Sequence, residues 1–353
     1  MNVGQRIAVA AIGACLILAA SAANRAAGAA DISGAGATFP YPIYAKWADA
    51  YRKLTGVGLN YQSIGSGGGI KQIKAKTVTF GASDMPLKPE DLNGAGLLQF
   101  PMIIGGVVPV VNVKGLAPGQ LHLDGATIAS IYMGEIAKWD DARIKKLNPG
   151  LALPATAIAP VYRSDGSGTN FLFSDYLSKE SPKFASSIGA NAAVEWPKGI
   201  GAKGNEGVAN MTTQTDGAIG YVEYAYAKQN KMTYATLTNK SGAVVAPSAE
   251  TFQAAAASAD WAKADSYYLV LTDQAGAKSW PITGASFILM YKDPPDPAAV
   301  KEALKFFAWA YKDGAPMAGE LDYVPLPASL IAQVKQTWAS QITAGGRPVW
   351  TGP

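Results

Sequence analysis

The sequence predicts an α/β protein built from two domains. Apolar segments with strand character alternate with segments of helical spacing, as in the strand-like 157–162 followed by the helical 170–177. The 353 residues are more than one hydrophobic core comfortably serves. Two long apolar strands, 100–112 and 281–291, divide the chain into three parts, and we expect the first and last parts to form one domain. The predicted domains are residues 31–104 with 276–353 and residues 105–275.

Residues 1–30 are predicted to be a secretory signal peptide. A positively charged start, 1–6, precedes an apolar run, 7–20, and the small residues 27–30 precede Asp31, the first acidic residue. The apolar run is shorter than the stretch of about 20 residues that spans a membrane as a helix. We therefore expect the remaining chain to be exported and soluble.

The single cysteine, Cys15, lies inside this apolar run. Residues 12–15 loosely resemble a lipoprotein cleavage site, but the run continues through 16–18, which favours an ordinary signal-peptide position over lipidation. Residues 21–23 offer a second candidate cleavage site. After cleavage no cysteine remains, so we expect no disulfide.

The charge of the chain argues against a nucleic-acid or membrane partner. The formal net charge is +4, and loss of Arg6 and Arg25 with the signal would leave +4 minus 2, or +2. A nucleic-acid site normally needs a concentrated basic surface, which this balance does not indicate. The 38 glycines instead indicate many unusual backbone positions.

The N-terminal part is predicted to alternate helix and strand. Tyr44, Trp47 and Tyr51 follow helical spacing, and Gly56 is placed to end that helix. The next predicted elements are a strand at 58–62, a short helix after the glycine-rich 65–69, and a strand at 77–82.

The central and C-terminal parts continue the alternation. Asp124 is a candidate N-cap for a helix through Tyr132. The other predictions are a strand at 217–222, a helical or loop segment at 246–266, and helices over 300–311 and 330–338. This order favours mostly parallel sheets, in which ligands bind at the carboxyl ends of the strands.

Four loops share one composition, in which glycines accompany hydroxyl or charged side chains. They are residues 35–39, 65–69, 81–84 and 163–169. Glycine lets the backbone approach a ligand closely, and a helix N-terminus presents unpaired N–H groups that favour an anion. Each loop alone is more simply an ordinary turn, but together they predict one anion-binding site.

Two charged positions give this site its chemistry. Arg163 provides a fork of donors suited to phosphate oxygens, although a surface cation is the simpler alternative. Asp165 either orients Arg163 or caps the following helix. Asp84 is an acceptor when ionised, so beside an anion it would prefer one that carries a proton, as phosphate does and sulfate does not; otherwise it caps a turn.

These motifs resemble the periplasmic phosphate-binding proteins of ATP-binding-cassette phosphate transporters. The resemblance spans the chain after the signal, through 34–40, 65–68, 80–84, 217–227 and 304–307. It implies a bilobal venus-flytrap fold of type II, with two hinge strands and phosphate buried between the lobes. It further implies a monomer without cofactor or metal that delivers phosphate from the periplasm to a membrane permease driven by ATPase subunits.

The resemblance also implies the site residues. The first lobe would bind phosphate through Thr38, the backbone N–H of Phe39, Ser66 and Asp84, which accepts the phosphate proton. The second lobe would bind through Arg163, Ser167, Gly168 and Thr169, with Asp165 pairing with Arg163.

An enzyme is the main competing class. A serine hydrolase needs a histidine, and the only one, His122, lies far in sequence from the serine loops. Ile64 and Asp165 occupy positions that a nucleophile elbow reserves for glycine. Residues 199–204 match a dinucleotide-binding pattern but are predicted to be a loop. A carrier of another tetrahedral oxyanion, an exported phosphoester hydrolase and an adhesive relative remain alternatives.

Overall fold

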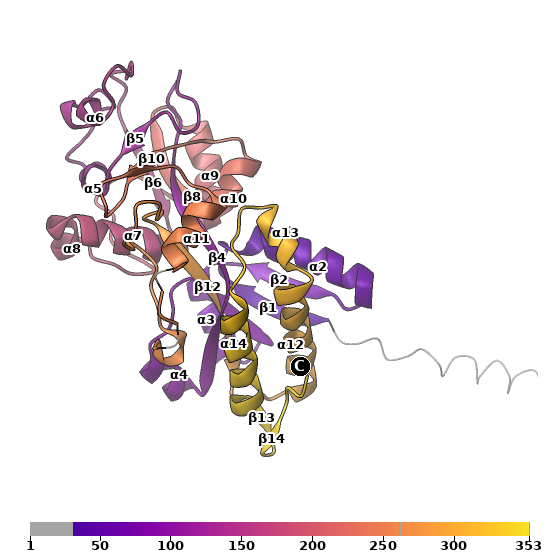
Figure 1. Cartoon of the computed structure of the whole chain (residues 1–353). Helices are drawn as coiled ribbons and strands as arrows, with labels where there is room; N and C mark the ends of the chain where they lie inside the picture. The colour runs from indigo at the N-terminus through magenta and orange to yellow at the C-terminus, as the bar shows by residue number, and fades with distance from the viewer. Residues whose placement is uncertain (1–30, 258, 262, 353) are drawn as a thin grey trace, which may run out of the picture.

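The protein is organised around one mixed β-sheet. The computed structural model describes residues 31–257, 259–261 and 263–352, so the predicted signal peptide and Cys15 lie outside the described residues. The sheet has nine strands in the order β2-β1-β3-β12-β4-β8-β6-β7, and β9 pairs with β4 (Figure 1). The strands are β1 (Ile32–Gly36), β2 (Leu59–Ser63), β3 (Phe80–Ser83), β4 (Leu97–Val111), β6 (Ala159–Arg163), β7 (Ile200–Ala202), β8 (Ala218–Glu223), β9 (Thr233–Tyr234) and β12 (Thr283–Tyr291).

Strand direction changes across the sheet. β1, β2 and β3 pair in parallel at one side, as do β6, β7 and β8 at the other. The two central strands β4 and β12 run antiparallel to their neighbours. The prediction of a mostly parallel sheet is therefore correct for the two sides and wrong for the centre, where strand direction cannot be read from an apolar run alone.

Strand β4 connects the two sides of the sheet. All 15 of its residues are buried, and its first part pairs with β12 while Val107–Val111 pair with β8. The second long strand, β12, pairs with β3 and β4 and begins at Thr283, opposite Gly106. It thus starts at the junction of the two sides and runs into the first side.

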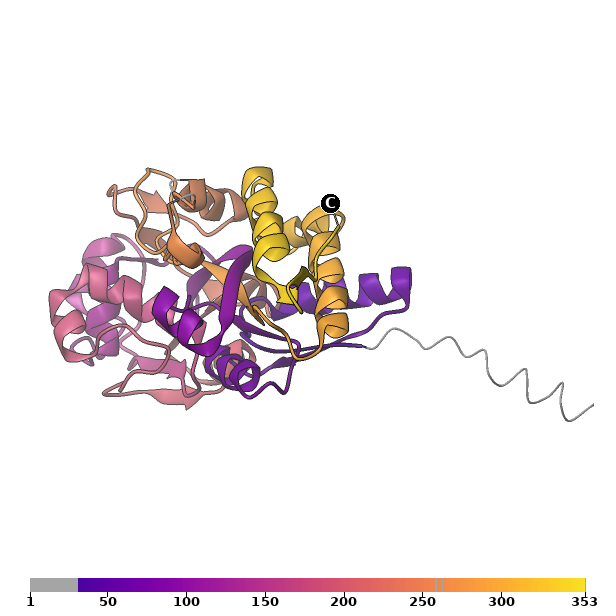
Figure 2. The ribbon, with the colours of Figure 1, turned by 90° about the horizontal axis from the view of Figure 1, so that it is seen from below.

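Helices from both ends of the chain cover the first side of the sheet. In Figure 2 the C-terminal helices lie together, away from the magenta and pink helices of the middle of the chain. Helix α2 buries Tyr44, Trp47 and Tyr51 and ends at Gly56, which has a φ of 80°. The helices are α2 (Tyr41–Thr55), α3 (Ser66–Lys74), α4 (Pro89–Ala95), α12 (Pro297–Lys312), α13 (Ala315–Gly319) and α14 (Ala328–Gln341), followed by the hairpin β13 (Thr343–Ala344) and β14 (Arg347–Pro348).

The middle of the chain supplies the second group of helices. Asp124 caps α5 by accepting from the Thr127 N–H, as predicted. The helices are α5 (Gly125–Tyr132), α6 (Ala142–Leu147), α7 (Gly168–Glu180), α8 (Pro182–Ser187), α9 (Gly204–Gln214), α10 (Tyr224–Gln229) and α11 (Ala249–Ala257). A small sheet joins β5 (His122–Leu123), β10 (Thr236–Thr238) and β11 (Val244–Val245), and a short 3₁₀ turn spans Asp265–Tyr267.

Residues 199–204, which were predicted to be a loop, contain regular structure. Strand β7 covers three of them and pairs in parallel with β6, and α9 begins at Gly204. Here the strand lies inside the glycine motif instead of before it, so the segment still differs from a dinucleotide-binding turn. This glycine-rich sequence has little strand propensity of its own, and it forms a strand because it pairs with β6.

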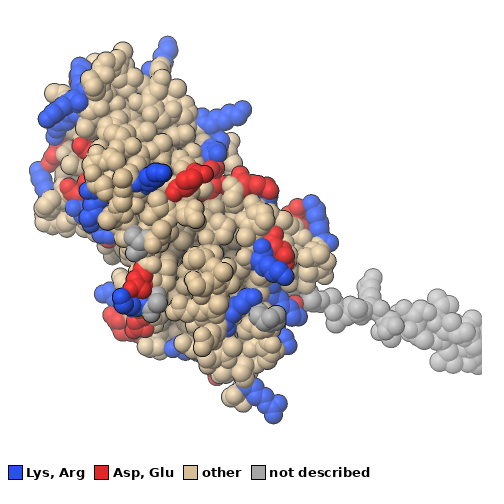
Figure 3. Space-filling view, viewed as in Figure 1, with Lys and Arg blue, Asp and Glu red and all other residues tan. Residues whose placement is uncertain are grey.

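The described residues form no helix that is both long and apolar enough to cross a membrane. On the face in Figure 3, lysine and arginine side chains alternate with acidic ones instead of gathering into a broad basic surface. This distribution agrees with the small net charge of the sequence.

Candidate anion-binding site

The loops singled out in the sequence follow the carboxyl ends of parallel strands. Thr38 and Phe39 follow β1, Ser66 follows β2 and Asp84 follows β3. On the other side of the sheet, Arg163 is the last residue of β6. Both groups of loops lie at the sheet edge where α/β proteins bind ligands.

Arg163 is held by a two-pronged ion pair with Asp165. Its Nε lies 2.7 Å from Asp165 Oδ1, and its Nη2 lies 2.6 Å from Oδ2. Arg163 is 3% exposed, and its Nη1 is buried without a partner among the described residues. The pairing fixes the plane of the guanidinium and leaves one nitrogen free to bind an anion.

Asp165 stays ionised in this arrangement. Burial raises its pKa, but the hydrogen bonds and positive charge of Arg163 and the Gly204 N–H outweigh burial, so the pKa is below the usual value. Gly204 N donates to Asp165 Oδ1 at 3.1 Å. The sequence left open whether Asp165 orients Arg163 or caps the next helix; in the structure it pairs with Arg163, and Ser167 is the cap.

The N-terminus of α7 brings Ser167, Gly168 and Thr169 to the same place. Ser167 Oγ accepts from the Asn170 N–H at 3.0 Å, which ends the strand-to-helix turn. A Cβ on Gly168 would lie 2.5 Å from Asp84 Cβ and 2.7 Å from Asp84 N. Only glycine allows this close approach between the two sides of the site.

Ser66 links both sides through its hydroxyl. Its Oγ accepts from Asp84 N at 3.2 Å and from Gly168 N at 3.0 Å. A further contact crosses the same gap, because Gly67 N donates to Gly166 O at 2.8 Å. The loops of the two sides are therefore in direct contact, and the site is closed.

Asp84 is the least satisfied group of the site. Its side chain is 1% exposed, and neither carboxyl oxygen has a hydrogen-bond partner among the described residues. Burial raises the pKa of Asp84 to about 7, although the nearby Ser286 hydroxyl, Arg163 and Ser66 each lower it. At neutral pH this carboxyl can therefore accept a proton or a hydrogen bond that a ligand brings.

Asn205 was missed in the sequence. It is fully buried, and its Nδ2 donates to Thr38 Oγ1 at 2.7 Å and to Thr169 Oγ1 at 3.1 Å. It thereby fixes one hydroxyl on each side of the site. The one available signal was its position directly after Gly204, the last residue of the segment that we predicted to be a loop.

Together these groups fit a small anion that carries a proton. The site combines a helix N-terminus and several hydroxyls with the Arg163 Nη1 and the Asp84 carboxyl, which have no hydrogen-bond partner among residues 31–257, 259–261 and 263–352. The donors suit negatively charged oxygens, and the carboxyl suits a protonated one. Inorganic phosphate near neutral pH offers both.

The structure gives the competing chemistries little support. His122 lies in β5 with its ring nitrogens near Thr236 Oγ1 and Thr238 Oγ1, and burial lowers its pKa. In the part of the chain that the structure describes, no three His, Cys, Asp or Glu side chains gather as a metal site.

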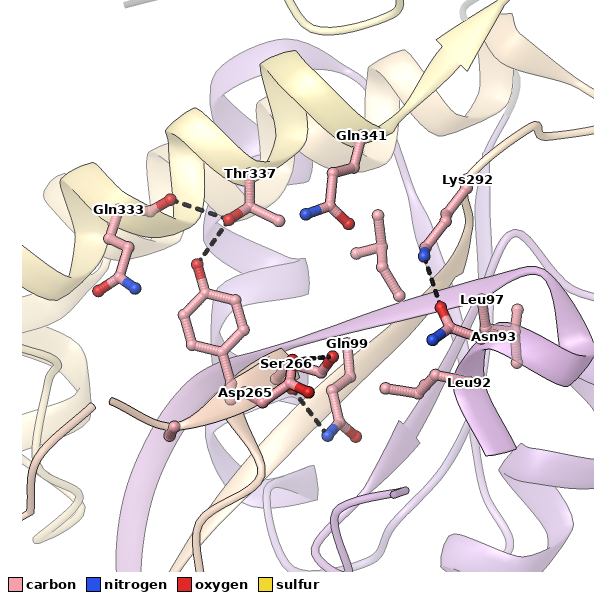
Figure 4. Close-up of a pocket in the computed structure, with 13 residues that line it drawn as sticks. Leu92, Asn93, Leu97, Gln99, Asp265, Ser266, Lys292, Gln333, Thr337 and Gln341 are labelled. Carbon is pink, nitrogen blue, oxygen red and sulfur yellow. Dashed lines mark hydrogen bonds between the residues drawn. The ribbon is translucent and has the colours of Figure 1, made fainter. Parts of the chain in front are cut away.

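A separate pocket of about 280 Å³ lies between α4, β4 and α14 (Figure 4). The groups that the figure joins by dashed lines are already paired within the protein. Gln99 donates to Ser266 O, Tyr267 bonds to Thr337, and Lys292 donates to Asn93. This pocket therefore presents no buried group that needs a ligand.

A mixed sheet whose two sides meet over a buried set of anion donors defines a substrate-binding protein of the periplasmic-binding-protein class. The sequence matches the PBP superfamily domain over residues 21–313. The chain belongs to the PstS family of phosphate-binding proteins. It is 54% identical to the phosphate-binding protein PstS of Xylella fastidiosa strain 9a5c over 310 residues, which cover 88% of this chain and 85% of the relative.

Other relatives agree. The phosphate-binding protein PstS of Pasteurella multocida is 53% identical over 91% of this chain and 94% of its own length. A solved phosphate-binding protein from Stenotrophomonas maltophilia has a TM-score of 0.70 at 21% identity, covering 90% of this chain and 97% of that chain. The predicted fold class and the predicted family are both confirmed.

Proposed function

We propose that this protein binds inorganic phosphate between the two sides of the site. The proposed ligands are Thr38, the Phe39 N–H, Ser66, Asp84, Arg163, Ser167, Gly168 and Thr169, with Asp165 supporting Arg163. The names of the PstS relatives support this ligand. The single observation that carries the proposal is the buried Asp84. Among the described residues neither of its carboxyl oxygens has a hydrogen-bond partner, and the same holds for the nearby Nη1 of Arg163.

Asp84 would select phosphate over sulfate. Hydrogen phosphate can donate its proton to the carboxylate, whereas sulfate would place two acceptors in contact within a buried site. An unsatisfied buried charge of this kind is unfavourable by several kcal/mol in typical cases, about 2 to 5. The preference would therefore be about 30- to 5000-fold in affinity.

Titration calorimetry of Asp84→Asn with phosphate and with sulfate tests this assignment. The variant should bind phosphate more weakly and discriminate less against sulfate, because the amide both donates and accepts. Lys88→Gln, an exposed change four residues away, is the matched control and should leave both affinities unchanged. An unchanged preference in the Asp84 variant would remove this residue from the site.

The proposed biological role is phosphate import. The loaded protein would dock on a membrane permease whose ATPase subunits drive uptake, and the protein itself would act as a monomer in the periplasm without catalysis. A solved structure of similar fold is described as a high-affinity periplasmic phosphate-binding protein bound with phosphate. Steady release of phosphate from a simple phosphoester by the purified protein would contradict a purely carrier function.

The two lobes would be residues 31–104 with 276–353 and residues 105–275, and they would separate to release phosphate. The lobes would meet at the Gly105 region of β4, and the contacts of Ser66 and Gly67 with the opposite loops would break on opening. Small-angle scattering should find a smaller radius of gyration with phosphate than without it. Equal radii would argue against closure.

A further inference from the structure

Three buried groups meet behind the loop that contains Phe39. Glu223 is the last residue of β8, and Glu223 and Tyr323 are each fully buried. Tyr323 Oη lies 2.6 Å from the Phe39 carbonyl oxygen and 2.8 Å from Glu223 Oε2. Tyr323 therefore joins the site loop of one side to the end of a strand on the other.

The number of protons at this junction decides the state of Glu223. A tyrosine hydroxyl has one proton, and a backbone carbonyl can only accept. If Tyr323 donates its proton to the closer acceptor, the Phe39 carbonyl oxygen, no hydrogen remains between Tyr323 Oη and Glu223 Oε2. These two oxygens would then be two acceptors in contact, unless Glu223 itself carries a proton. A protonated Glu223 Oε2 donates to Tyr323 Oη, and every close contact then holds a hydrogen.

The other contacts of Glu223 agree with a neutral carboxyl. Its Oε2 accepts from the Ala225 N–H at 2.9 Å, which a protonated oxygen can still do. Its Oε1 is buried without a partner, and no lysine, arginine or histidine among the described residues forms an ion pair with it. An ionised carboxylate here would leave a buried charge uncompensated, which is far less favourable than a neutral acid.

The elements packed against Glu223 supply other acids and tyrosines. Asp322 lies beside Tyr323 and pairs with Lys228 Nζ at 2.7 Å. Tyr226 on α10 lies near Glu206 of α9, and β4 contributes no ionisable residue opposite. Burial is the main cause that raises the pKa of Glu223 well above its usual value; Tyr323 and the α10 N–H groups oppose it, and Asp322 adds to it.

The same junction orients the peptide that precedes Phe39. Tyr226 Oη donates to Thr38 O at 2.7 Å, and Thr38 O and the Phe39 N–H belong to one peptide group. Tyr323 holds the next carbonyl, that of Phe39. The two tyrosines thus fix the direction of the Phe39 N–H from both sides.

We propose that Glu223 is protonated when the site is closed and donates to Tyr323, which makes both of them positioning residues for the Phe39 N–H. The inference rests on the proposed phosphate function of that loop. Because Glu223 and Phe39 belong to opposite sides, opening would expose the carboxyl to water and let it ionise. Closure over phosphate would therefore take up a proton at Glu223.

Infrared difference spectroscopy tests the protonation directly. The phosphate-loaded wild type should show a C=O stretch of a neutral carboxylic acid that disappears in Glu223→Gln and persists in Asp84→Asn, the other buried acid whose pKa is raised. If Glu223→Gln instead loses the bands of an ionised carboxylate and the C=O band is unchanged, Glu223 is ionised in the loaded protein and the proposal is wrong.

Phosphate affinity across pH tests the positioning role. The amide of Glu223→Gln can donate to Tyr323 as the neutral acid does, so it should bind within about threefold of wild type at pH 6, whereas Glu223→Ala and Tyr323→Phe should bind at least about tenfold more weakly. The affinity of Glu223→Gln relative to wild type should rise with pH, by at most about tenfold per unit. Phosphate and Asp84 also change protonation in this pH range. Both proteins share these changes, so the comparison uses only the ratio of the two affinities.

The control is Glu90→Gln, on the exposed side of α4, which should follow the wild type at every pH. A Glu223→Gln variant as weak as Glu223→Ala, or a ratio independent of pH, would refute the inference while phosphate binding by the wild type still stands. If the wild type itself fails to bind phosphate, the proposed function fails, and the proton uptake on closure that rests on it fails with it.

Discussion

The two sides of the site each contain an aspartate, fully buried at Asp84 and partly buried at Asp165, and the two aspartates have opposite electrostatics. Asp165 lies against the guanidinium of Arg163, and its pKa is below the usual value in spite of burial. Neither carboxyl oxygen of Asp84 has a hydrogen-bond partner in the part of the chain that the structure describes, and burial raises the pKa of Asp84 to about 7. The same side chain is therefore a fixed anion on one side and a proton acceptor on the other.

Because of this difference, one side of the site attracts anions in general and the other side selects among them. The Arg163 side combines a cation with a helix N-terminus, a combination that would attract any small oxyanion. The Asp84 side adds a group that accepts only an anion with a proton to donate. Four predictions test this division, beginning with the largest expected effect.

Replacement of Arg163 with methionine should almost abolish phosphate binding. The variant loses the buried cationic donor and leaves Asp165 as an uncompensated charge, so we expect the Kd to rise by about 1000-fold or more. Calorimetry with Arg163→Lys as the comparison separates charge from geometry, because lysine keeps the charge without the fork. Wild-type affinity in the methionine variant would exclude Arg163 as a ligand.

Asp165→Asn should destabilise the fold by about 3 kcal/mol at pH 7, since it leaves the buried guanidinium of Arg163 without its counter-ion. The folded-state pKa of Asp165 is lowered, so its stabilisation is present above the ordinary pKa and is lost as pH falls through the folded value. The difference in unfolding free energy between variant and wild type should therefore shrink toward pH 3. Urea denaturation at several pH values measures it; a constant difference would contradict the ion-pair explanation.

Gly168→Ala should weaken phosphate binding by about 10- to 100-fold through a steric effect of roughly 1 to 3 kcal/mol. The new Cβ would lie 2.5 Å from Asp84 Cβ in the closed form. Gly94→Ala is a suitable control, because no atom lies within 4 Å of a Cβ placed there. Equal affinity in the two variants would mean that the close contact between the sides is not needed for binding.

Asp84→Asn should stabilise the phosphate-free protein at pH 8, by about 1.4 kcal/mol for each unit by which burial raises the pKa of Asp84 in that state. The folded protein holds the Asp84 proton to about pH 7, above the ordinary value of 3.8, so wild-type stability falls as pH rises between these values. Thermal unfolding from pH 4 to 8 should show that the stability difference between Asp84→Asn and the wild type increases as the pH rises. Parallel curves would mean that Asp84 is not buried in the free protein.

Local patterns in the sequence predicted much of the fold. Helical spacing predicted α2 and its end at Gly56, and Asp124 was correctly read as a helix cap. Strand direction in the centre of the sheet and the strand at 200–202 were not predicted, because both depend on which neighbour a segment pairs with. Periodicity reports which face of a segment is buried and carries no information about its partner.

The candidate site divides in the same way. Residues 163–169 were readable as a unit, since a cation, its counter-ion and a helix cap lie within seven consecutive positions. Asn205, Glu223 and Tyr323 were not, because each acts on a loop more than 100 residues away in sequence. Glu223 lies within the motif 217–227, but nothing in the local sequence of the three residues indicates these contacts.

The sequence by itself determined the chemical character of the site: a glycine-rich set of loops with one cation, several hydroxyls and a carboxyl. Only the tertiary structure decided which aspartate keeps its charge, because a pKa depends on burial and on the distance to other charges. Composition and spacing fix which groups are available to a site. Their protonation and mutual contacts arise when the sheet brings distant segments together.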